Sequence, residues 1–296
     1  MNILIAGGSG FLGTALSARL TKNNHKIYIL TRQRPRSADQ IQWDARMLNG
    51  WTQRLEEMDA VIHLTGYGLE HWPWTSRHKK RFIDSRVIPG LALASAFEKA
   101  SRRPGIFVQA SGINRYGLRG DAIADESTVP GTDFLGQLTI RWENATQSID
   151  ELGVRRVILR TAAVLARHGG QLPLMTLPVR LFFGGKFGSG KQSMNWIHVD
   201  DYTRAILFLL ENETARGPYN LISPAQSPGE DFMHAAARAL HRPFWFHIPK
   251  ALLQLTLGEM SDLLTEGRYA QPKRLLEQGF QFQFGKLDDA LQDLLA

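Results

Sequence analysis

The chain has 296 residues and no cysteine, and its 35 Lys and Arg against 28 Asp and Glu give a formal net charge of +7. The lack of cysteine excludes disulfides, thiol catalysis and cysteine–zinc centres, and the nine histidines fall in no metal-ligand spacing. The basic residues are scattered apart from one dense run at 77–81, so the charge predicts a solvated surface and no specific nucleic-acid site.

Hydrophobic residues make up 43% of the chain, which is enough for a substantial core. No apolar run reaches the length needed to span a bilayer, and the first residues lack the basic region and cleavage site of a secretion signal. We therefore expect a cytoplasmic protein with no membrane partner.

The first element in chain order is an apolar strand at 3–5 that runs through a glycine-rich turn into a helix. Leucines then recur every fourth position from 12 to 20, so the hydrophobic period changes from extended to helical at the glycines. Such glycines allow a tight turn, close approach of the backbone to a pyrophosphate, and packing of helix on strand, while the helix N-terminus stabilises the phosphate. The residues predicted to contact a dinucleotide are Gly7, Gly10, Phe11, Leu12 and Gly13.

A second strand at 26–30 completes a βαβ unit and leads to Thr31 and Arg32. An acidic residue at this strand end would hydrogen bond the ribose hydroxyls of NAD, whereas an arginine accommodates the 2′-phosphate of NADP. Because no acid follows the strand, Thr31 and Arg32 predict NADP(H) as the cofactor. A third strand is expected at 41–44, where Asp44 either meets the adenine amino group or caps the next turn.

A fourth strand at 60–64 ends at the carboxyl edge of the sheet, where Leu64 and Thr65 are expected to line the cofactor. His63 within this strand is interpreted as a packed core residue.

A long helix is predicted at 75–100, bent or restarted at Pro89. It carries Arg81 and Arg86, either of which can reach a phosphate or ribose of the cofactor. For Arg81 the alternative is a place on the solvated basic face of this helix.

The fifth strand, 106–110, leads to Ser111 and then to the pair Tyr116-Gly117. Together with the glycine loop, this pattern resembles the extended short-chain dehydrogenase/reductase superfamily, which includes nucleotide-sugar epimerases and dehydratases. Further motifs make the chain similar, over essentially its whole length, to epimerase-family proteins of the YfcH type. These motifs are Asp133-Phe134-Leu135, Trp142-Glu143, Gly184-Gly185, Gly188-Ser189-Gly190, Gln192, the run 196–201, and the C-terminal runs 257–260, 272–275 and Gly279-Phe280.

The chain departs from this superfamily at its acid/base pair. Most members carry Tyr-x-x-x-Lys on the helix after the serine strand, where Tyr transfers the proton, Lys lowers its pKa and Ser orients the substrate. Here the helix begins near Asp133 and has Phe134 and Leu138 where the pair is expected, and a benzyl ring cannot transfer a proton.

Other residues are therefore the candidates for the chemistry. Ser111 is retained as the substrate-orienting group, Tyr116 is the preferred proton donor, and Glu143, His198 and Glu126 are held in reserve. Each replacement has a structural alternative: Tyr116 as a turn residue, Glu126 as a surface acid, Glu143 as a helix salt-bridge partner and His198 as an anchor at a helix start.

A sixth strand is expected at 157–161, with Val164 just beyond it at the nicotinamide end of the cofactor. The glycine-rich and apolar segment 169–193 is predicted to lie over the substrate crevice. Four side chains there would suit an anionic or hydroxyl-rich ligand: Arg160, Arg180, Lys191 and Gln192.

The remaining elements are a helix that starts at Asp200 and Asp201 and ends near Leu210, and a strand at 219–221 that returns to the sheet. The two acids would complement the helix dipole and supply the N-cap. Amphipathic helices follow at 232–240 and 287–295.

Taken together, these elements predict an α/β fold, a Rossmann-type doubly wound parallel sheet with a smaller C-terminal mixed α/β lobe. Residues 1–165 form the NADP-binding domain, to which 199–222 returns, and 166–296 supply the substrate-side loops and the lobe. The resemblance implies an NADP(H)-binding oxidoreductase or nucleotide-sugar epimerase acting on a small polar or nucleotide-linked substrate. The alternative is a catalytically silent NADPH-binding sensor or regulatory protein.

Overall fold

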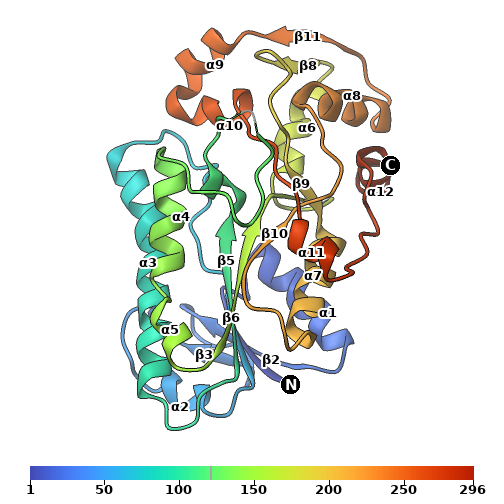
Figure 1. Cartoon of the computed structure of the whole chain (residues 1–296). Helices are drawn as coiled ribbons and strands as arrows, with labels where there is room; N and C mark the ends of the chain where they lie inside the picture. The colour runs from blue at the N-terminus through green and yellow to red at the C-terminus, as the bar shows by residue number, and fades with distance from the viewer. Residues whose placement is uncertain (121) are drawn as a thin grey trace.

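A seven-stranded parallel sheet forms the centre of the computed structural model, which describes residues 1–120 and 122–296 (Figure 1). The strand order is β10-β6-β5-β4-β1-β2-β3. This order confirms the predicted Rossmann-type doubly wound sheet. The strands are β1 (Asn2–Ala6), β2 (Lys26–Thr31), β3 (Gln40–Gln42), β4 (Ala60–His63), β5 (Ile106–Gly112), β6 (Arg155–Thr161) and β10 (Gly217–Leu221).

Helices cover both faces of the sheet, because the alternating side chains of its central strands are apolar on both sides. Ile3 and Ile5 of β1 pack with Leu16 and Leu20 of α1 (Phe11–Lys22), on the face that α7 (Val199–Glu211) also covers. Leu4 on the other face packs in a cluster with residues of α2 (Trp51–Leu55), α3 (Ser76–Lys99) and α5 (Ser148–Glu151). The helix α4 (Phe134–Asn144) lies beside α3 (Figure 1).

A smaller lobe lies beyond the carboxyl ends of the strands, at the top of Figure 1. Its core joins Leu172, Val179, Phe232 and Leu291. Its elements are α6 (Leu172–Arg180), β8 (Gly184–Phe187), α8 (Gly229–Ala239), β11 (Phe244–Ile248), α9 (Lys250–Leu257), η2 (Gly258–Ser261), α10 (Asp262–Thr265) and α12 (Leu287–Leu295). The connecting elements are η1 (Ile113–Tyr116), the paired strands β7 (Ala163–Leu165) and β9 (Trp196–His198), and α11 (Lys273–Glu277).

The chain after residue 199 is shared between sheet and lobe. The strand β10 hydrogen bonds to β6 at the sheet edge, and α7 packs on the sheet. Leu275 and Phe280, which belong to the C-terminal segment, also join the core beside α7.

Three local expectations differ from the structure. The third strand ends at Gln42, before the expected residue 44. Of the two roles left open for Asp44, the structure shows the turn cap, because its carboxylate accepts the backbone N–H groups of Arg46 and Met47, both at 2.8 Å. The helix α3 continues through Pro89 without a restart.

The third difference is the cap of α7, which is neither Asp200 nor Asp201. His198 is the N-cap, and its Nδ1 accepts the backbone N–H of Asp200 at 3.0 Å. Asp201 instead lies fully buried and accepts backbone N–H groups of Gln283 and Phe284, which ties the C-terminal segment to α7.

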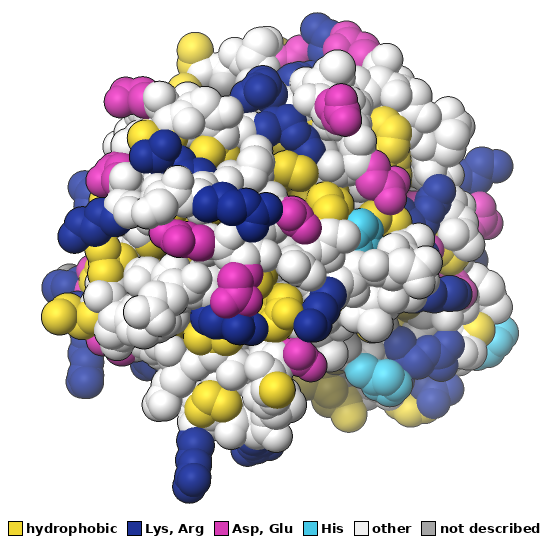
Figure 2. Space-filling view, turned by 90° about the horizontal axis from the view of Figure 1, so that it is seen from below, with side chains coloured by type: hydrophobic (Ala, Val, Ile, Leu, Met, Phe, Trp, Pro, Cys, Tyr) yellow, Lys and Arg dark blue, Asp and Glu magenta, His cyan; other side chains and the backbone are white. Residues whose placement is uncertain are grey.

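The surface carries mixed charge, and no helix within residues 1–120 and 122–296 has the length and apolarity to cross a bilayer. On the face drawn in Figure 2, Lys and Arg side chains are interspersed with Asp and Glu. That face therefore shows no large field of a single sign.

The glycine loop between β1 and α1 depends on two close backbone approaches. Gly7 has φ +89°, a left-handed conformation that glycine adopts without strain. A Cβ on Gly13 would lie 2.4 Å from the carbonyl oxygen of Gly7 and 2.5 Å from Cα of Gly8, so a side chain there forces the helix away from the strand.

We expect Gly13→Ala to lower the free energy of unfolding by about 1–3 kcal/mol, because the added methyl overpacks rigid backbone. Urea unfolding followed by circular dichroism measures this change. Gly50→Ala is the matched control, since a Cβ at Gly50 meets nothing within 4 Å. Equal stabilities of the two variants would contradict the packing role of Gly13.

Candidate functional site

A cavity of about 440 Å³ lies between the carboxyl edge of the sheet and the lobe. The sheet side contributes Phe11 and Leu12 from the start of α1, Ser111 from the end of β5 and Val164 from β7. The helix α4 contributes one wall, and the lobe closes the other side. Residues that follow different parallel strands are thus gathered at one edge, where doubly wound sheets bind their ligands.

The glycine loop has the shape that a dinucleotide phosphate requires. A Cβ at Gly10 would meet only the carbonyl oxygen of Gly7, at 3.4 Å, so the outer side of this glycine is open to a ligand. Gly10 is also the N-cap residue of α1 and makes no side-chain cap. The first N–H groups of such a helix have no partner within the helix, and they favour an anion.

Arg86 of α3 lines the same cavity and is the second feature that fits a cofactor. Its Nη1 donates to the carbonyl oxygens of Tyr67 at 2.9 Å and Phe82 at 3.0 Å. Its Nε is buried and has no acceptor among the described residues. Burial lowers the pKa of Arg86 to about 10, so the guanidinium remains charged at neutral pH and can donate to a ribose or phosphate oxygen.

The other predicted cofactor residues lie along the sheet edge outside the cavity lining. Thr31 and the exposed Arg32 stand at the end of β2, and Leu64 and Thr65 follow β4. Arg81 is exposed and its guanidinium stacks 3.9 Å from the ring centroid of Tyr67. The structure therefore brings Phe11, Leu12, Arg86 and Val164 together at the cavity, with Arg32 at the far end of the edge.

His63 lies inside the sheet beneath Thr65. Its side chain is fully buried, and Nε2 is 2.6 Å from Oγ1 of Thr65. Burial, with a smaller effect of Arg86, lowers the pKa of His63 to about 3, so the ring is neutral at physiological pH. It packs as a core residue.

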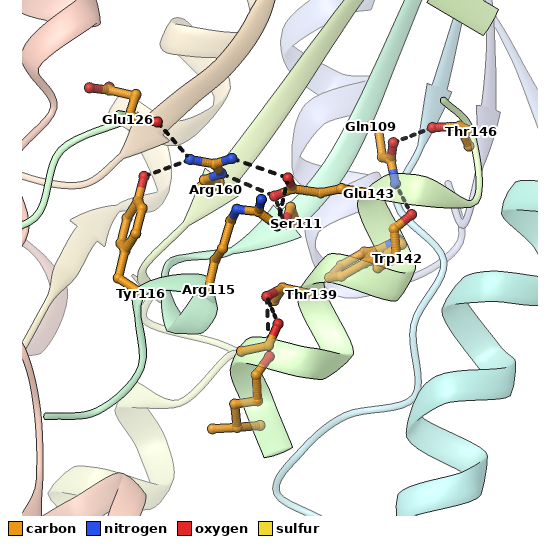
Figure 3. Close-up of polar contacts among 12 residues, drawn as sticks. Gln109, Ser111, Arg115, Tyr116, Glu126, Thr139, Trp142, Glu143, Thr146 and Arg160 are labelled. Atoms are coloured by element: carbon orange, nitrogen blue, oxygen red, sulfur yellow. Dashed lines mark hydrogen bonds and ion pairs between the residues drawn. The ribbon is translucent and has the colours of Figure 1, made fainter. Parts of the chain in front are cut away.

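A buried ion-pair cluster stands directly behind Ser111 (Figure 3). The carboxylate of Glu143 binds Arg160 through two contacts, from Nε at 3.0 Å and from Nη2 at 3.1 Å. Arg115 is a second cation, with Nη1 at 3.1 Å from Oε2. The hydroxyl of Ser111 donates to Oε1 of Glu143 at 2.7 Å. Burial lowers the pKa of Arg160, but hydrogen bonding and the charge of Glu143 outweigh it and raise the pKa overall.

Arg160 extends this cluster to Tyr116 and Glu126 (Figure 3). Its Nη1 donates to the hydroxyl of Tyr116 and to the backbone carbonyl of Glu126, both at 3.0 Å. The Tyr116 hydroxyl donates in turn to Oδ1 of Asn220 at 2.7 Å. Burial raises the pKa of Tyr116, and its proton is already engaged, although the ring lines the cavity.

Glu126 lies in the core and not on the surface. Its Oε1 accepts the backbone N–H of Asn220 at 3.0 Å, and burial raises the pKa of the carboxyl. The alternative of a surface acid is therefore wrong for this residue, which is 8% exposed.

The cavity side of α4 is formed by Leu135, Leu138, Thr139 and Trp142. Phe134 is not part of this lining, and its ring packs 5.9 Å from that of Trp74. Leu135 and Thr139 are four residues apart on the cavity side, and Thr139 Oγ1 donates to the helix carbonyls of Leu135 and Gly136. Of the two sequence positions proposed for the missing pair, only Leu138 faces the cavity, and none of the α4 residues that line it is ionisable.

Three other predicted contacts lie away from the cavity lining. His198 caps α7, stacks on Phe284 with ring centroids 3.8 Å apart, and has Nε2 at 3.2 Å from Asp293. Arg180 and Lys191 are exposed. Gln192 does line the cavity, where its Nε2 donates to the backbone carbonyls of Phe187 and Leu264.

Sequence reasoning missed Arg115, Asn220 and the methionines of the cavity. Arg160, which directly follows the apolar run 157–159, was one signal, because a buried guanidinium needs acceptors and the Glu143 carboxylate can supply them. No sequence motif indicates that Asn220 pairs with Tyr116. The two residues are 104 positions apart in the chain, and the Asn220 side chain accepts the hydrogen bond from the Tyr116 hydroxyl. Over the described part of the chain, no group of three or more His, Asp or Glu is arranged to hold a metal ion.

Comparisons with known proteins agree over the whole chain. The model of the NAD dependent epimerase/dehydratase family matches residues 3–221, and a domain of unknown function, DUF1731, matches 248–294. An epimerase family protein of Mycobacterium leprae is 34% identical, covering 98% of this chain and 94% of its own. The epimerase family protein YfhF of Bacillus subtilis is also 34% identical, covering 100% and 98%.

Solved structures give the same result for the fold. The human epimerase family protein SDR39U1 (isoform 2), crystallised with NADPH, superimposes with a TM-score of 0.89 at 30% identity, covering 100% of this chain and 99% of its own. The UDP-glucose 4-epimerase of Thermus thermophilus in complex with NAD gives 0.80 at 16% identity, covering 100% and 99%. The latter likeness shows the fold alone.

We expect Glu143→Gln to lower the free energy of unfolding by about 3–5 kcal/mol, because it leaves two buried guanidinium groups facing a neutral amide. Urea unfolding at neutral pH measures the change. Asp288→Asn is the control, since it removes the carboxylate of a pair with Arg238 that is exposed on both sides. A loss for Glu143→Gln no larger than for Asp288→Asn would show that the cluster does not hold the fold together.

Proposed function

This chain belongs to the NAD dependent epimerase/dehydratase family, as its resemblance to extended short-chain dehydrogenase/reductases implied, and we propose that it is an NADP(H)-dependent oxidoreductase. One observation carries the proposal: a single cavity extends from Phe11 and Leu12, the first two residues of α1 after the glycine loop, to a chamber closed by the lobe. When bound, the nicotinamide cofactor supplies or accepts a hydride. Its pyrophosphate would lie against Gly10 and the start of α1, and Arg86 would donate to a ribose or phosphate oxygen.

The preference for NADP(H) rests on the end of β2. Arg32 is exposed there, and no acid occurs between Lys26 and Arg36 to accept hydrogen bonds from free ribose hydroxyls. A guanidinium can bind a 2′-phosphate through two charge-assisted hydrogen bonds. The human relative crystallised with NADPH supports this choice.

The lobe side of the cavity favours an oxidoreductase over a nucleotide-sugar epimerase. A sugar nucleotide needs donors and acceptors along its length, whereas this wall is largely apolar. Its apolar side chains are Leu174, Met175, Phe187, Met194, Phe232, Met233, Met260, Leu263 and Leu264. Although the sequence favoured a polar substrate, this wall favours a substrate with an apolar body.

Polar groups on the same wall are mostly occupied by the protein. Arg268 donates to the carbonyl oxygen of Ala122, and Asn195 donates to the carbonyl of Arg268. The Oε1 of Gln192 is buried and lacks a donor within the described residues, so it is available to accept a substrate hydroxyl or N–H. The cavity thus offers broad apolar contact and few fixed polar contacts.

Ser111 is the residue that we assign to the reacting end of the substrate. Its proton is directed to Glu143, so its oxygen presents lone pairs to the cavity and can accept a substrate hydroxyl proton. Glu143 would orient this serine without contacting the substrate. Tyr116 stays a candidate proton donor, but its hydroxyl must first break its hydrogen bond to Asn220.

The second candidate function is an NADPH-binding regulatory protein without turnover. The observation that favours it is the cavity face of α4, where Leu135 and Thr139 supply no proton-transfer group. Loss of general acid/base catalysis typically costs about 10²–10⁴-fold in rate, so such a site would turn over slowly.

NADPH carrying deuterium at C4 distinguishes these functions when it is incubated with the protein and a metabolite extract. An oxidoreductase transfers deuterium to a metabolite and accumulates NADP⁺, and Ser111→Ala slows this transfer while the NADPH dissociation constant is unchanged. An epimerase interconverts sugar nucleotides without net NADPH oxidation. A regulatory protein does neither while still binding NADPH. The last two results would overturn the proposal.

We expect the chain to bind NADPH at least about ten-fold more tightly than NADH, since charge-assisted contacts to a 2′-phosphate contribute roughly 1.5–3 kcal/mol. Arg32→Ala should remove most of this preference and leave the NADH dissociation constant unchanged. Isothermal titration calorimetry measures both constants. Arg77→Ala, which removes an exposed arginine from the first turn of α3, is the control for net charge. Equal constants for the two cofactors in the unmodified protein would contradict the assignment of Arg32.

A further inference from the structure

Exposed apolar side chains gather on the lobe. More than half of the large hydrophobic residues that the described structure exposes lie on α6, β11, α9 or the turn before β8. They are Leu174, Leu177, Leu181, Phe182, Phe183, Trp245, Phe246, Leu252 and Leu255, which we call the lobe patch. The strand β8 pairs with β11 and contacts α6, and α9 follows β11 at the top of Figure 1. Exposed apolar clusters of this kind mark interaction surfaces.

The helix α6 is apolar on both of its sides. Leu172, Thr176 and Val179 face the lobe core and are buried. Leu174, Leu177 and Leu181 are exposed, and their spacing of three and four residues puts them on one outer stripe. A helix that is hydrophobic all round is found in an apolar environment and not in water.

Aromatic side chains extend this stripe beyond the helix end. Phe183 contacts Phe246 with ring centroids 5.8 Å apart, and Trp245 packs edge-on to Phe246 at 5.6 Å. Trp245 Nε1 donates to the carbonyl oxygen of Phe182 at 3.0 Å, yet the side chain stays 67% exposed. Projecting Trp and Phe side chains suit the boundary between lipid headgroups and acyl chains.

The two segments that carry the lobe patch contribute basic side chains and no acidic ones. Neither 168–199 nor 232–258 contains an Asp or Glu. Arg180, Lys191 and Arg242 are exposed and have no carboxylate within 4 Å in the described structure. The nearby cations that are paired, Lys186 and Lys250, take their acids from Glu230 and Glu266 of other segments.

We propose that the lobe patch docks on the surface of an anionic lipid bilayer, with its aromatic residues inserted and its cations at the headgroups. This proposal departs from the sequence-based expectation of no membrane partner, which considered only segments that could span a bilayer. Charge complementarity selects this occupant, because basic residues near an anionic membrane surface are attracted to it. A second copy of the chain is the alternative occupant. A two-fold interface would bring two copies of the lobe patch together, and the segments that carry it contain cations but no carboxylate to pair with them, which opposes association.

The lobe patch reaches the cavity at Leu174, which is exposed and also lines it. A bilayer docked on the lobe patch would therefore lie next to the apolar lobe wall of the cavity. The docking inference does not rest on the proposed oxidoreductase activity, since it is drawn from exposure and charge alone.

Co-sedimentation of the full chain with vesicles tests the proposal. We expect binding to vesicles of phosphatidylcholine with phosphatidylglycerol, and at least about ten-fold weaker binding to phosphatidylcholine alone or in 0.5 M NaCl. Phe182→Ser with Phe183→Ser, and separately Trp245→Ser, should each weaken binding by roughly ten-fold through loss of buried apolar area. Arg180→Gln with Arg242→Gln should weaken binding to the anionic vesicles only.

Val129→Ser is the matched control, because Val129 is a 77% exposed apolar residue on a loop outside the lobe patch. It should bind vesicles as the unmodified chain does. Failure of the unmodified chain to bind anionic vesicles overturns the proposal. So does a dimer, measured by light scattering, that Phe182→Ser with Phe183→Ser dissociates, because the lobe patch would then be covered by a second copy.

Discussion

The Glu143 carboxylate, buried between two arginines, is the interaction on which the arrangement at the sheet edge depends. It joins α4 to β6 through Arg160 and to η1 through Arg115, and it fixes the serine at the end of β5. A buried charge that loses its partner is far more costly than one at the surface, so these elements are held in one arrangement. The wall of the cavity is thus set by electrostatics as well as by packing.

The same cluster determines which chemistry the cavity can support. Ser111 and Tyr116 both line it, but each hydroxyl proton already has an acceptor inside the protein. Both carboxylate oxygens of Glu143 are already in contact with arginines, and one of them also accepts the Ser111 hydroxyl. The proposed oxidoreductase activity is compatible with this arrangement if hydride transfer makes little demand on a protein acid.

Local patterns were enough to locate most of the fold. The change from extended to helical period at Gly7–Gly13 predicted β1, the turn and α1, and alternating apolar strands and amphipathic helices predicted the parallel sheet. The site was predicted less completely. Positions on α4 were assigned one by one from the sequence, but the side that faces the cavity depends on how α4 packs against α3 and β5. That packing turns Leu135 and Thr139 inward and leaves Phe134 against Trp74.

The sequence by itself determined the family, the glycine loop and the doubly wound parallel sheet, because each is encoded by neighbouring residues whose spacing carries the signal. Only the tertiary structure decided the partners of Arg160, the burial of Glu126, the cap of α7 and the exposure of the aromatic residues on the lobe. Those contacts join segments far apart along the chain, as Tyr116 and Asn220 do across 104 residues. Burial and pairing of this kind depend on the distance between side chains in space, and spacing along the chain does not specify that distance.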